Sequence, residues 1–251
     1  MAFTNSQLVA YSKLSPNYNP RSSKIDTITP HIVVGHLSLK TLGKIFANSA
    51  REASSNYGID DFGASAMFVE EKNRSWCSSS AANDHRAITI EIASDTTYPY
   101  AITDKAMQGL IFLCADICKR NKIPKLLWKA DKSLIGKIDQ QNISVHRWFA
   151  PKECPGEYVY SRLGDVAAEV NKILIPTPIQ QTAAWTYAVK INADSLNYRQ
   201  GPGIYYPIVG KVHKGEIYTI VDEAYGAGSS KWGKLKSGAG WISLDYCTKV
   251  W

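Results

Sequence analysis

The sequence has no apolar run of the roughly 20 residues that a helix needs to span a bilayer, so we expect no membrane insertion. It also lacks the basic start and apolar stretch of a secretory signal, since it opens Met-Ala-Phe-Thr-Asn-Ser-Gln. We therefore expect synthesis in the cytoplasm, with release only by some other device. The 251 residues, of which 45% are hydrophobic and 20% charged, fit a soluble globular protein with one large or two modest domains.

Cysteine is scarce as well: the five residues lie at positions 77, 114, 118, 154 and 247, without regular spacing. This odd number excludes a simple disulfide framework. Cys114 and Cys118 stand in a stretch whose apolar residues repeat every three or four positions, which indicates the buried face of a helix. Cys77 and Cys247 have no ligand-type neighbours at useful spacing, and we interpret them as packing residues too.

Lysine and arginine form no long block, although they outnumber aspartate and glutamate by 29 to 22 and the formal net charge is +7. A net positive charge favours a polyanionic partner. Because the basic residues are scattered and no recognition-helix pattern is present, we expect no nucleic-acid partner. Strong, salt-dependent affinity for DNA would contradict this expectation.

Strand-like and helix-like segments alternate over the first 174 residues, which predicts an α/β domain with a mixed central sheet flanked by helices. The clearest strand is Ala87-Ile-Thr-Ile-Glu91-Ile-Ala, with its isoleucines on one face and Thr89 and Glu91 on the other. In the strand at 25–34, Pro30 suits the end or edge of a sheet. The expected strands are 25–34, 57–59, 66–70, 87–93 and a short piece at 143–146; the expected helices are 38–50, 103–121 and 157–173; residues 1–24 and 72–86 are expected to be irregular.

The residue pattern of the sequence changes after residue 174, where helical periodicity ends. Residues 175–182 contain Pro176 and Pro178 and no periodicity, which is typical of a semi-rigid linker. From 183 to 251 no helical stripe occurs, and short strands such as 217–221 and 240–243 are punctuated by glycine. This pattern predicts a small all-β barrel. We therefore expect two domains, 1–174 and 183–251, joined by the linker.

A histidine and a cysteine eight positions apart, His146 and Cys154, are two candidate zinc ligands. On one continuous helix they would lie about 12 Å apart along the axis, which is too far for a single ion. Pro151, Pro155 and Gly156 permit the segment to fold back as a loop. Two ligands do not complete a tetrahedral site, so a third has to come from elsewhere in the chain.

The remaining histidines are His31, His36, His85 and His213. We favour His31, because alternation places it on the polar face of its strand and because His146 and Cys154 need a partner. A lone histidine on a strand is more often a satisfied polar residue, and that alternative stays open. Three protein ligands with a free fourth position are typical of catalytic zinc.

Hydrolysis at such a centre needs a base for water and a cation or donor for the developing oxyanion. Glu91, on the polar face of an otherwise apolar strand, suits the base, and Lys152, two residues before Cys154, suits the second role. The alternatives are an exposed strand carboxylate and a solvated surface lysine.

The runs Ile28-Thr-Pro-His31, Ile88-Thr-Ile-Glu91 and Lys152-Glu-Cys154-Pro155 resemble the zinc-dependent N-acetylmuramoyl-L-alanine amidases of the type-2 family, which are related to peptidoglycan-recognition proteins. The resemblance covers about residues 22–174. It implies Zn²⁺ held by His31, His146 and Cys154, with Glu91 as base and Lys152 assisting. The implied reaction cleaves the amide between N-acetylmuramic acid and the L-alanine of the stem peptide.

Two positions depart from the pattern of this family. Many relatives have a second histidine where this chain has Ile32, but that histidine is not a ligand, so the metal site is expected to survive. Some relatives use a catalytic tyrosine near Tyr57, where Ser55 lies closer to the expected position, and we assign no role to Tyr57. Residues that could line a glycan–peptide groove, or equally serve packing, are Trp76, Asn83 and Trp148.

The C-terminal run Leu196-Asn-Tyr-Arg199-Gln-Gly201, followed by Lys214-Gly215 and Gly240-Trp241, resembles the bacterial Src-homology-3-type cell-wall-binding domain. The resemblance implies that this domain tethers the enzyme to the wall. Tyr205 and Tyr206 are candidate wall contacts, whereas Trp232 and Trp241 suit core packing.

Together, these resemblances predict a peptidoglycan amidase with a wall-binding tail, most like a phage endolysin that reaches the wall from the host cytoplasm. The expected partner is peptidoglycan, and other anionic wall polymers would be attracted to the positive charge. A bacterial autolysin or a bacteriocin-like lysin would share the chemistry and differ in delivery. The alternative of another class is a non-catalytic recognition protein, but such relatives usually lack the cysteine that this chain has at Cys154.

Overall fold

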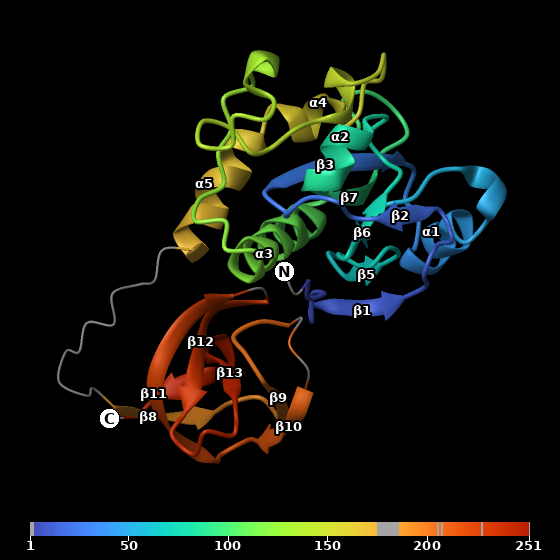
Figure 1. Cartoon of the computed structure of the whole chain (residues 1–251). Coiled ribbons are helices and arrows are strands. Elements are labelled where there is room, and N and C mark those ends of the chain that lie inside the picture. Colours follow the sequence, from blue (N-terminus) through green and yellow to red (C-terminus); the bar gives the residue numbers. More distant parts are fainter. Residues whose placement is uncertain (1–2, 175–185, 205, 207, 227, 251) are drawn as a thin grey trace. The chain divides into compact units, whose positions relative to one another are not determined.

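The computed structural model describes residues 3–174, 186–204, 206, 208–226 and 228–250 (Figure 1). The chain divides into two compact units, Met1–Ile175 and Pro176–Trp251. The predicted linker at 175–182 lies outside the described residues. None of the described helices is both long enough and apolar enough to cross a membrane.

The first unit is built on a mixed five-stranded sheet with the strand order β1-β5-β4-β7-β3. β4 and β5 are antiparallel, whereas β1–β5, β4–β7 and β7–β3 are parallel pairs. The strands of this sheet are β1 (Val9–Ser12), β3 (Thr27–Val34), β4 (Tyr57–Ile59), β5 (Ser65–Met67) and β7 (Ala87–Ser94). The predicted α/β class with a mixed central sheet is therefore confirmed.

The two faces of this sheet differ in chemistry. Tyr57 and Ile90 belong to a large apolar cluster with residues of α3 (Asp104–Arg120) and α5 (Leu163–Leu174). Gly58, which alternates with Tyr57, points to the other face, where a Cβ would lie 3.0 Å from Leu42 of α1 (Leu39–Phe46). Helix α1 therefore covers part of that face. The rest of that second face carries polar side chains at the middle of β3 and β7.

The long helix α3 confirms the helix predicted at 103–121. Its N-cap is Thr103, whose hydroxyl accepts a hydrogen bond from the N–H of Ala106. Cys114 and Cys118 are 1% and 0% exposed, as expected for the buried side of this helix. Helix α1 begins at the predicted cap, Ser38, but ends at Phe46 rather than near residue 50.

Two regions that we expected to be irregular contain regular elements. Residues 1–24 include β1 and β2 (Tyr18–Pro20), and residues 72–86 include β6 (Asn73–Ser75) and α2 (Ala81–Arg86). β2 and β6 pair with each other, and α2 is capped by Ser80. These elements are short and are paired or capped by residues outside them, so the local periodicity of the sequence does not predict them.

The helix expected at 157–173 is in fact two helices, α4 (Gly156–Tyr160) and α5. The break lies at Ser161 and Arg162. The hydroxyl of Ser161 donates to the carbonyl of Glu157, and a serine that bonds to backbone in this way competes with helix continuation.

The segment from Ile143 to Gly156 folds back against β3. Ile143 forms a parallel bridge with Ile28, and the N–H of Ser144 donates to the Ile28 carbonyl at 3.1 Å. Only the beginning of this segment is extended. His146 is the first residue of the 3-10 helix η3 (His146–Trp148), so the prediction that His146 lies on a short strand is wrong. At the end of the segment, Gly156 has φ +74°, and a Cβ there would lie 2.9 Å from the Cδ1 of Ile32.

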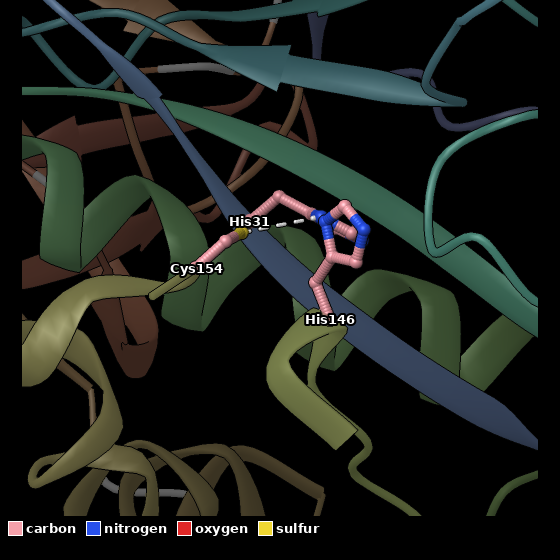
Figure 2. A group of neighbouring side chains, drawn as sticks. All are labelled: His31, His146 and Cys154. Atoms are coloured by element: carbon pink, nitrogen blue, oxygen red, sulfur yellow. Dashed lines mark hydrogen bonds between the residues drawn. The ribbon is translucent and has the colours of Figure 1, made fainter. Parts of the chain in front are cut away.

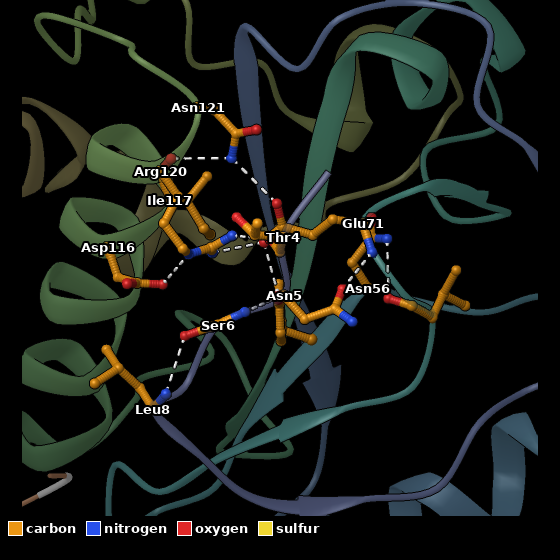
Figure 3. Close-up of polar contacts among 12 residues, drawn as sticks. Thr4, Asn5, Ser6, Leu8, Asn56, Glu71, Asp116, Ile117, Arg120 and Asn121 are labelled. Atoms are coloured by element: carbon orange, nitrogen blue, oxygen red, sulfur yellow. Dashed lines mark hydrogen bonds and ion pairs between the residues drawn. The ribbon is translucent and has the colours of Figure 1, made fainter. Parts of the chain in front are cut away.

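A buried ionic network ties the N-terminal residues to the core (Figure 3). The Glu71 side chain is fully buried and forms a 2.6 Å ion pair with Arg120 of α3. It also accepts hydrogen bonds from the Tyr57 hydroxyl at 2.7 Å and from Asn121 at 3.1 Å. The Glu71 N–H donates to the side chain of Asn5, and Arg120 donates to the carbonyl of Thr4. These two hydrogen bonds fix the N-terminal segment to the network.

The second unit is all-β, as predicted, with a seven-stranded sheet in the order β10-β9-β13-β12-β11-β8-β14. All its pairings are antiparallel. Trp232 is 2% exposed, as expected for a packing residue. The strands are β8 (Tyr187–Ile191), β9 (Ser195–Arg199), β10 (Ile208–His213), β11 (Ile217–Gly226), β12 (Ser229–Leu235), β13 (Trp241–Ser243) and β14 (Cys247–Lys249).

Replacing Arg120 with methionine should lower the free energy of unfolding of the first unit by about 3–5 kcal/mol, because it leaves the buried Glu71 carboxylate without its cation. Urea unfolding followed by tryptophan fluorescence measures the change. The control is Lys172→Met, which removes an exposed pair with Glu169 and should cost less than about 1 kcal/mol. Equal losses in the two variants would contradict a structural role for the buried pair.

Gly156→Ala should destabilise the first unit by about 1–3 kcal/mol more than Gly136→Ala. Both glycines have left-handed φ, +74° and +86°, so the backbone cost of alanine is common to the two variants. Only at Gly156 would the new methyl group meet tight neighbours, Ile32 and Tyr100 at 2.9 Å, since the nearest atom at Gly136 is 3.5 Å away. Denaturation midpoints of the two variants give the comparison; a more stable Gly156→Ala would refute this packing.

Candidate metal centre and catalytic groups

Three side chains from separate segments converge on the polar face of the sheet (Figure 2). His31 comes from β3, His146 from η3, and Cys154 from the loop that precedes α4. One potential ligand atom of each lies within 4.8 Å of the other two. The His31 Nδ1 is 3.3 Å from the Cys154 Sγ, and the two imidazole rings lie 5.1 Å apart in an edge-on arrangement.

Burial determines the protonation of these three groups. It lowers the pKa of His31 to about 3, with His146 as a smaller cause, and it also lowers the pKa of His146. Both rings are therefore neutral near pH 7, which is the form that binds metal ions. Burial raises the pKa of the Cys154 thiol, and Glu91 adds to that increase. A bound cation would favour the thiolate and so reverse this effect.

The donor set fits a zinc ion. Two imidazole nitrogens and one sulfur are typical zinc ligands, and three protein ligands leave a fourth position free. The His31 Nε2 is buried and has no hydrogen-bond partner among the described residues. Since buried polar atoms are normally satisfied, this histidine is better explained as a ligand than as a packing residue.

Glu91 lies next to His31 because the two residues are register partners in the β3–β7 pair. Its Oε2 is shielded from solvent and has no hydrogen-bond partner among the described residues, while its Oε1 accepts a weak hydrogen bond from the Cys77 thiol at 3.6 Å. Burial raises the pKa of Glu91 to about 7, and the Cys77 hydrogen bond and Arg51 oppose the increase. This carboxylate can therefore exchange a proton near neutral pH, unlike an exposed one.

Lys152 is exposed at the edge of the centre. It lines a hollow of about 300 Å³ together with Tyr98, Arg147, Glu153 and Glu157. Its positive charge contributes to the lowered pKa of His146, so it acts on the centre electrostatically.

Two residues near the centre were not predicted as members of it. Cys77, which we interpreted as a packing residue, lies beside Glu91, and the Ser79 hydroxyl lies 2.9 Å from the His146 Nε2. Both belong to the loop before α2, whose N–H groups at Cys77 and Ser78 donate to the carboxylate of Asp84. The only signal in the sequence was the concentration of polar residues at 72–86.

The residues considered for a glycan–peptide groove have different surroundings. Trp76 is partly exposed and its indole N–H donates to Asn19 at 2.7 Å. Asn83 is buried, where it donates to Thr29 and accepts from Ser144. Trp148 is 8% exposed and stacks on Trp128, with ring centroids 5.2 Å apart.

Tyr57 lies on the opposite face of the sheet from His31, in the Glu71 network, and is 0% exposed. In the second unit, Tyr205 lies outside the described residues, and Tyr206 is 37% exposed. The Tyr206 carbonyl accepts a hydrogen bond from Arg199.

Comparisons with solved structures give several likenesses at low identity. A mutant endolysin from Bacillus subtilis is 17% identical, over 64% of this chain and 99% of that one, with a TM-score of 0.48. An AmpD derivative is 19% identical, over 66% and 99%, with a TM-score of 0.49. PlyL is 15% identical, over 69% and 97%, with a TM-score of 0.45. A comparison with curated proteins gives no match.

Because these TM-scores are below 0.5, the family assignment depends on a different comparison. The family model described as N-acetylmuramoyl-L-alanine amidase matches residues 20–157, which is more than half of the chain. The match includes His31, Glu91, His146 and Cys154. The family is typically zinc-dependent and acts on the peptidoglycan of the cell wall. The chain belongs to the N-acetylmuramoyl-L-alanine amidase family.

Proposed function

We propose that this chain is a zinc-dependent peptidoglycan hydrolase in which His31, His146 and Cys154 hold the ion. The reaction is hydrolysis of the amide between the lactyl carbonyl of N-acetylmuramic acid and the amino group of L-alanine. The observation that carries the proposal is the convergence of two neutral imidazoles and one thiol beside a carboxylate oxygen that has no hydrogen-bond partner among the described residues.

Zinc, when bound, supplies a Lewis acid and makes water nucleophilic near neutral pH. His31 and His146 offer nitrogen lone pairs without first losing a proton, because burial keeps both rings neutral. Cys154 contributes a negative charge as thiolate, which offsets part of the charge of the ion. The stacking of Trp148 on Trp128 fixes the 3-10 helix that carries His146.

Glu91 acts as the general base. Its Oε2 takes a proton from the attacking water as the water oxygen bonds to the lactyl carbonyl carbon. The same carboxyl group then delivers that proton to the alanine nitrogen as the carbon–nitrogen bond breaks. The products are a muramic acid carboxylate and a stem peptide with a free amino terminus.

Lys152 stabilises the oxyanion that develops on the lactyl carbonyl. An ammonium group on a flexible side chain can approach this oxygen and need not be buried before the substrate binds. Its exposure and its position beside the 300 Å³ hollow support this role.

The second unit is proposed to act as a cell-wall-binding domain, with Tyr205 and Tyr206 among its contacts. The net charge of +7 supports attraction to anionic wall polymers as well as to peptidoglycan. We infer a phage endolysin that is made in the host cytoplasm and acts on the wall after release. A bacterial autolysin or a bacteriocin-like lysin would use the same residues and differ in delivery.

Single substitutions should separate metal binding from proton transfer. Cys154→Ala should lose most bound zinc and all measurable hydrolysis, whereas Glu91→Gln should keep its zinc and lose at least about 100-fold in rate. Zinc content by mass spectrometry and turbidity loss of purified walls give the two readouts. Cys247→Ser, which removes a thiol from the second unit, is the control and should match wild type. Full zinc content in Cys154→Ala would refute the ligand assignment.

Digestion of purified peptidoglycan should release new alanine amino termini without new reducing sugar ends, because only the amide bond is cut. Dinitrophenyl labelling of amino termini and a reducing-sugar assay distinguish this outcome from glycosidase action. The alternative of a non-catalytic recognition protein predicts wall binding with neither product. Absence of new amino termini from walls of several species with different stem peptides would contradict the proposed activity.

A further inference from the structure

The residue after His146 joins the two arms of the segment that carries both His146 and Cys154. The N–H of Arg147 donates to the Cys154 carbonyl at 3.1 Å, and its Nη2 donates to the Glu153 carbonyl at 2.5 Å. These two carbonyls belong to the peptide groups on either side of the Cys154 Cα. Arg147 therefore fixes the stretch of backbone that orients the Cys154 side chain.

The guanidinium of Arg147 is held by α4. Its Nη1 pairs with Glu157 at 3.2 Å, and its central carbon lies 4.4 Å from the centre of the Tyr160 ring. The Tyr160 ring is edge-on to Trp128, which stacks on Trp148 of η3. A planar guanidinium can bond to a carbonyl and a carboxylate while it stacks on a ring. The arginine thus connects η3, the loop at Cys154 and α4.

The other proposed ligand on the sheet has a different support. β3 pairs with β7 from Thr27 to Val34, so the backbone of His31 is fixed by the sheet itself. Cys154 lies in the loop before α4, outside the helices and strands. The Arg147–Glu157 ion pair alone would contribute little, because Glu157 is 42% exposed. The hydrogen bonds to the two carbonyls are therefore the part of this contact that positions the sulfur.

We infer that Arg147 is a positioning residue for the metal centre, because it holds Cys154 against the helix of His146 before zinc binds. Without this link the segment opens, and the apparent affinity for zinc falls with the fraction of molecules in which the ligands are assembled. Residues that orient a metal ligand change metal affinity by roughly 10–100-fold when they are replaced. The inference rests on the proposed function, which assigns His146 and Cys154 as ligands.

Arg147→Met should bind zinc at least about tenfold more weakly than wild type, as measured on the full-length chain by competition with a chromogenic chelator. The matched control is Arg162→Met. The Arg162 guanidinium also stacks on a tyrosine, at 3.9 Å from the Tyr158 ring centre, and donates to the Tyr158 carbonyl. This control should keep the wild-type affinity. Equal affinities in wild type and Arg147→Met, or equal losses in the two variants, would overturn the inference.

Arg147→Lys separates the charge of the side chain from its geometry. A lysine keeps the positive charge, but its ammonium group cannot bond to the Glu153 carbonyl and to Glu157 while it stacks on Tyr160. Its zinc affinity should therefore stay about fivefold or more below that of wild type. Wild-type affinity in Arg147→Lys would show that charge alone is sufficient and would refute positioning by hydrogen bonds. Failure of the wild-type protein to bind zinc would instead reject the proposed function.

Hydrogen–deuterium exchange of the metal-free protein tests the same link without an ion. In Arg147→Met the amides of residues 146–156 should exchange at least about tenfold faster than in wild type, while those of β3 and β7 keep their rates. Arg162→Met should leave the exchange of 146–156 unchanged. Unchanged exchange in Arg147→Met would contradict the inference, and so would faster exchange throughout the first unit, which would indicate general destabilisation.

Discussion

The parallel pairing of β3 with β7 is the constraint on which the centre depends. Its register places His31 opposite Glu91, so the proposed ligand and the proposed base lie side by side on one face of the sheet. Side chains of paired residues share a face, and a slip of one residue would send one of the two into the apolar core. The isoleucines that alternate with them, Ile28, Ile90 and Ile92, oppose such a slip because they fill that core.

The same alternation explains how a buried polar centre is tolerated. The Nε2 of His31 and the Oε2 of Glu91 lack hydrogen-bond partners in the described part of the chain, and each such atom costs about 1–3 kcal/mol. The continuous cluster of strand and helix side chains under the opposite face offsets this cost. The packed apolar core thus lies on one side of the sheet and the candidate centre on the other.

Much of this arrangement could be predicted from the sequence, because it depends on local patterns. The capping residues Ser38 and Thr103 predict the starts of α1 and α3, and the alternation around Glu91 predicts β7. Strand register is not local, however, and neither is the position of a loop whose contacts are distant. The sequence therefore predicted His31 and Glu91 on polar faces, but it did not predict the 3-10 helix at His146 or the proximity of Cys77 to Glu91.

The hydrogen-bond network around the buried Glu71 extends beyond the region that the family model matches. That region begins at residue 20, yet Thr4 and Asn5 bond directly to Arg120 and to the backbone of Glu71. The last helix, α5, lies beyond the matched end at residue 157 and supplies apolar side chains to the main core. The first compact unit therefore extends beyond the matched region at both ends. A fragment trimmed to residues 20–157 would lose the contacts of Thr4 and Asn5 with the Glu71–Arg120 pair and would expose the core side chains that α5 covers.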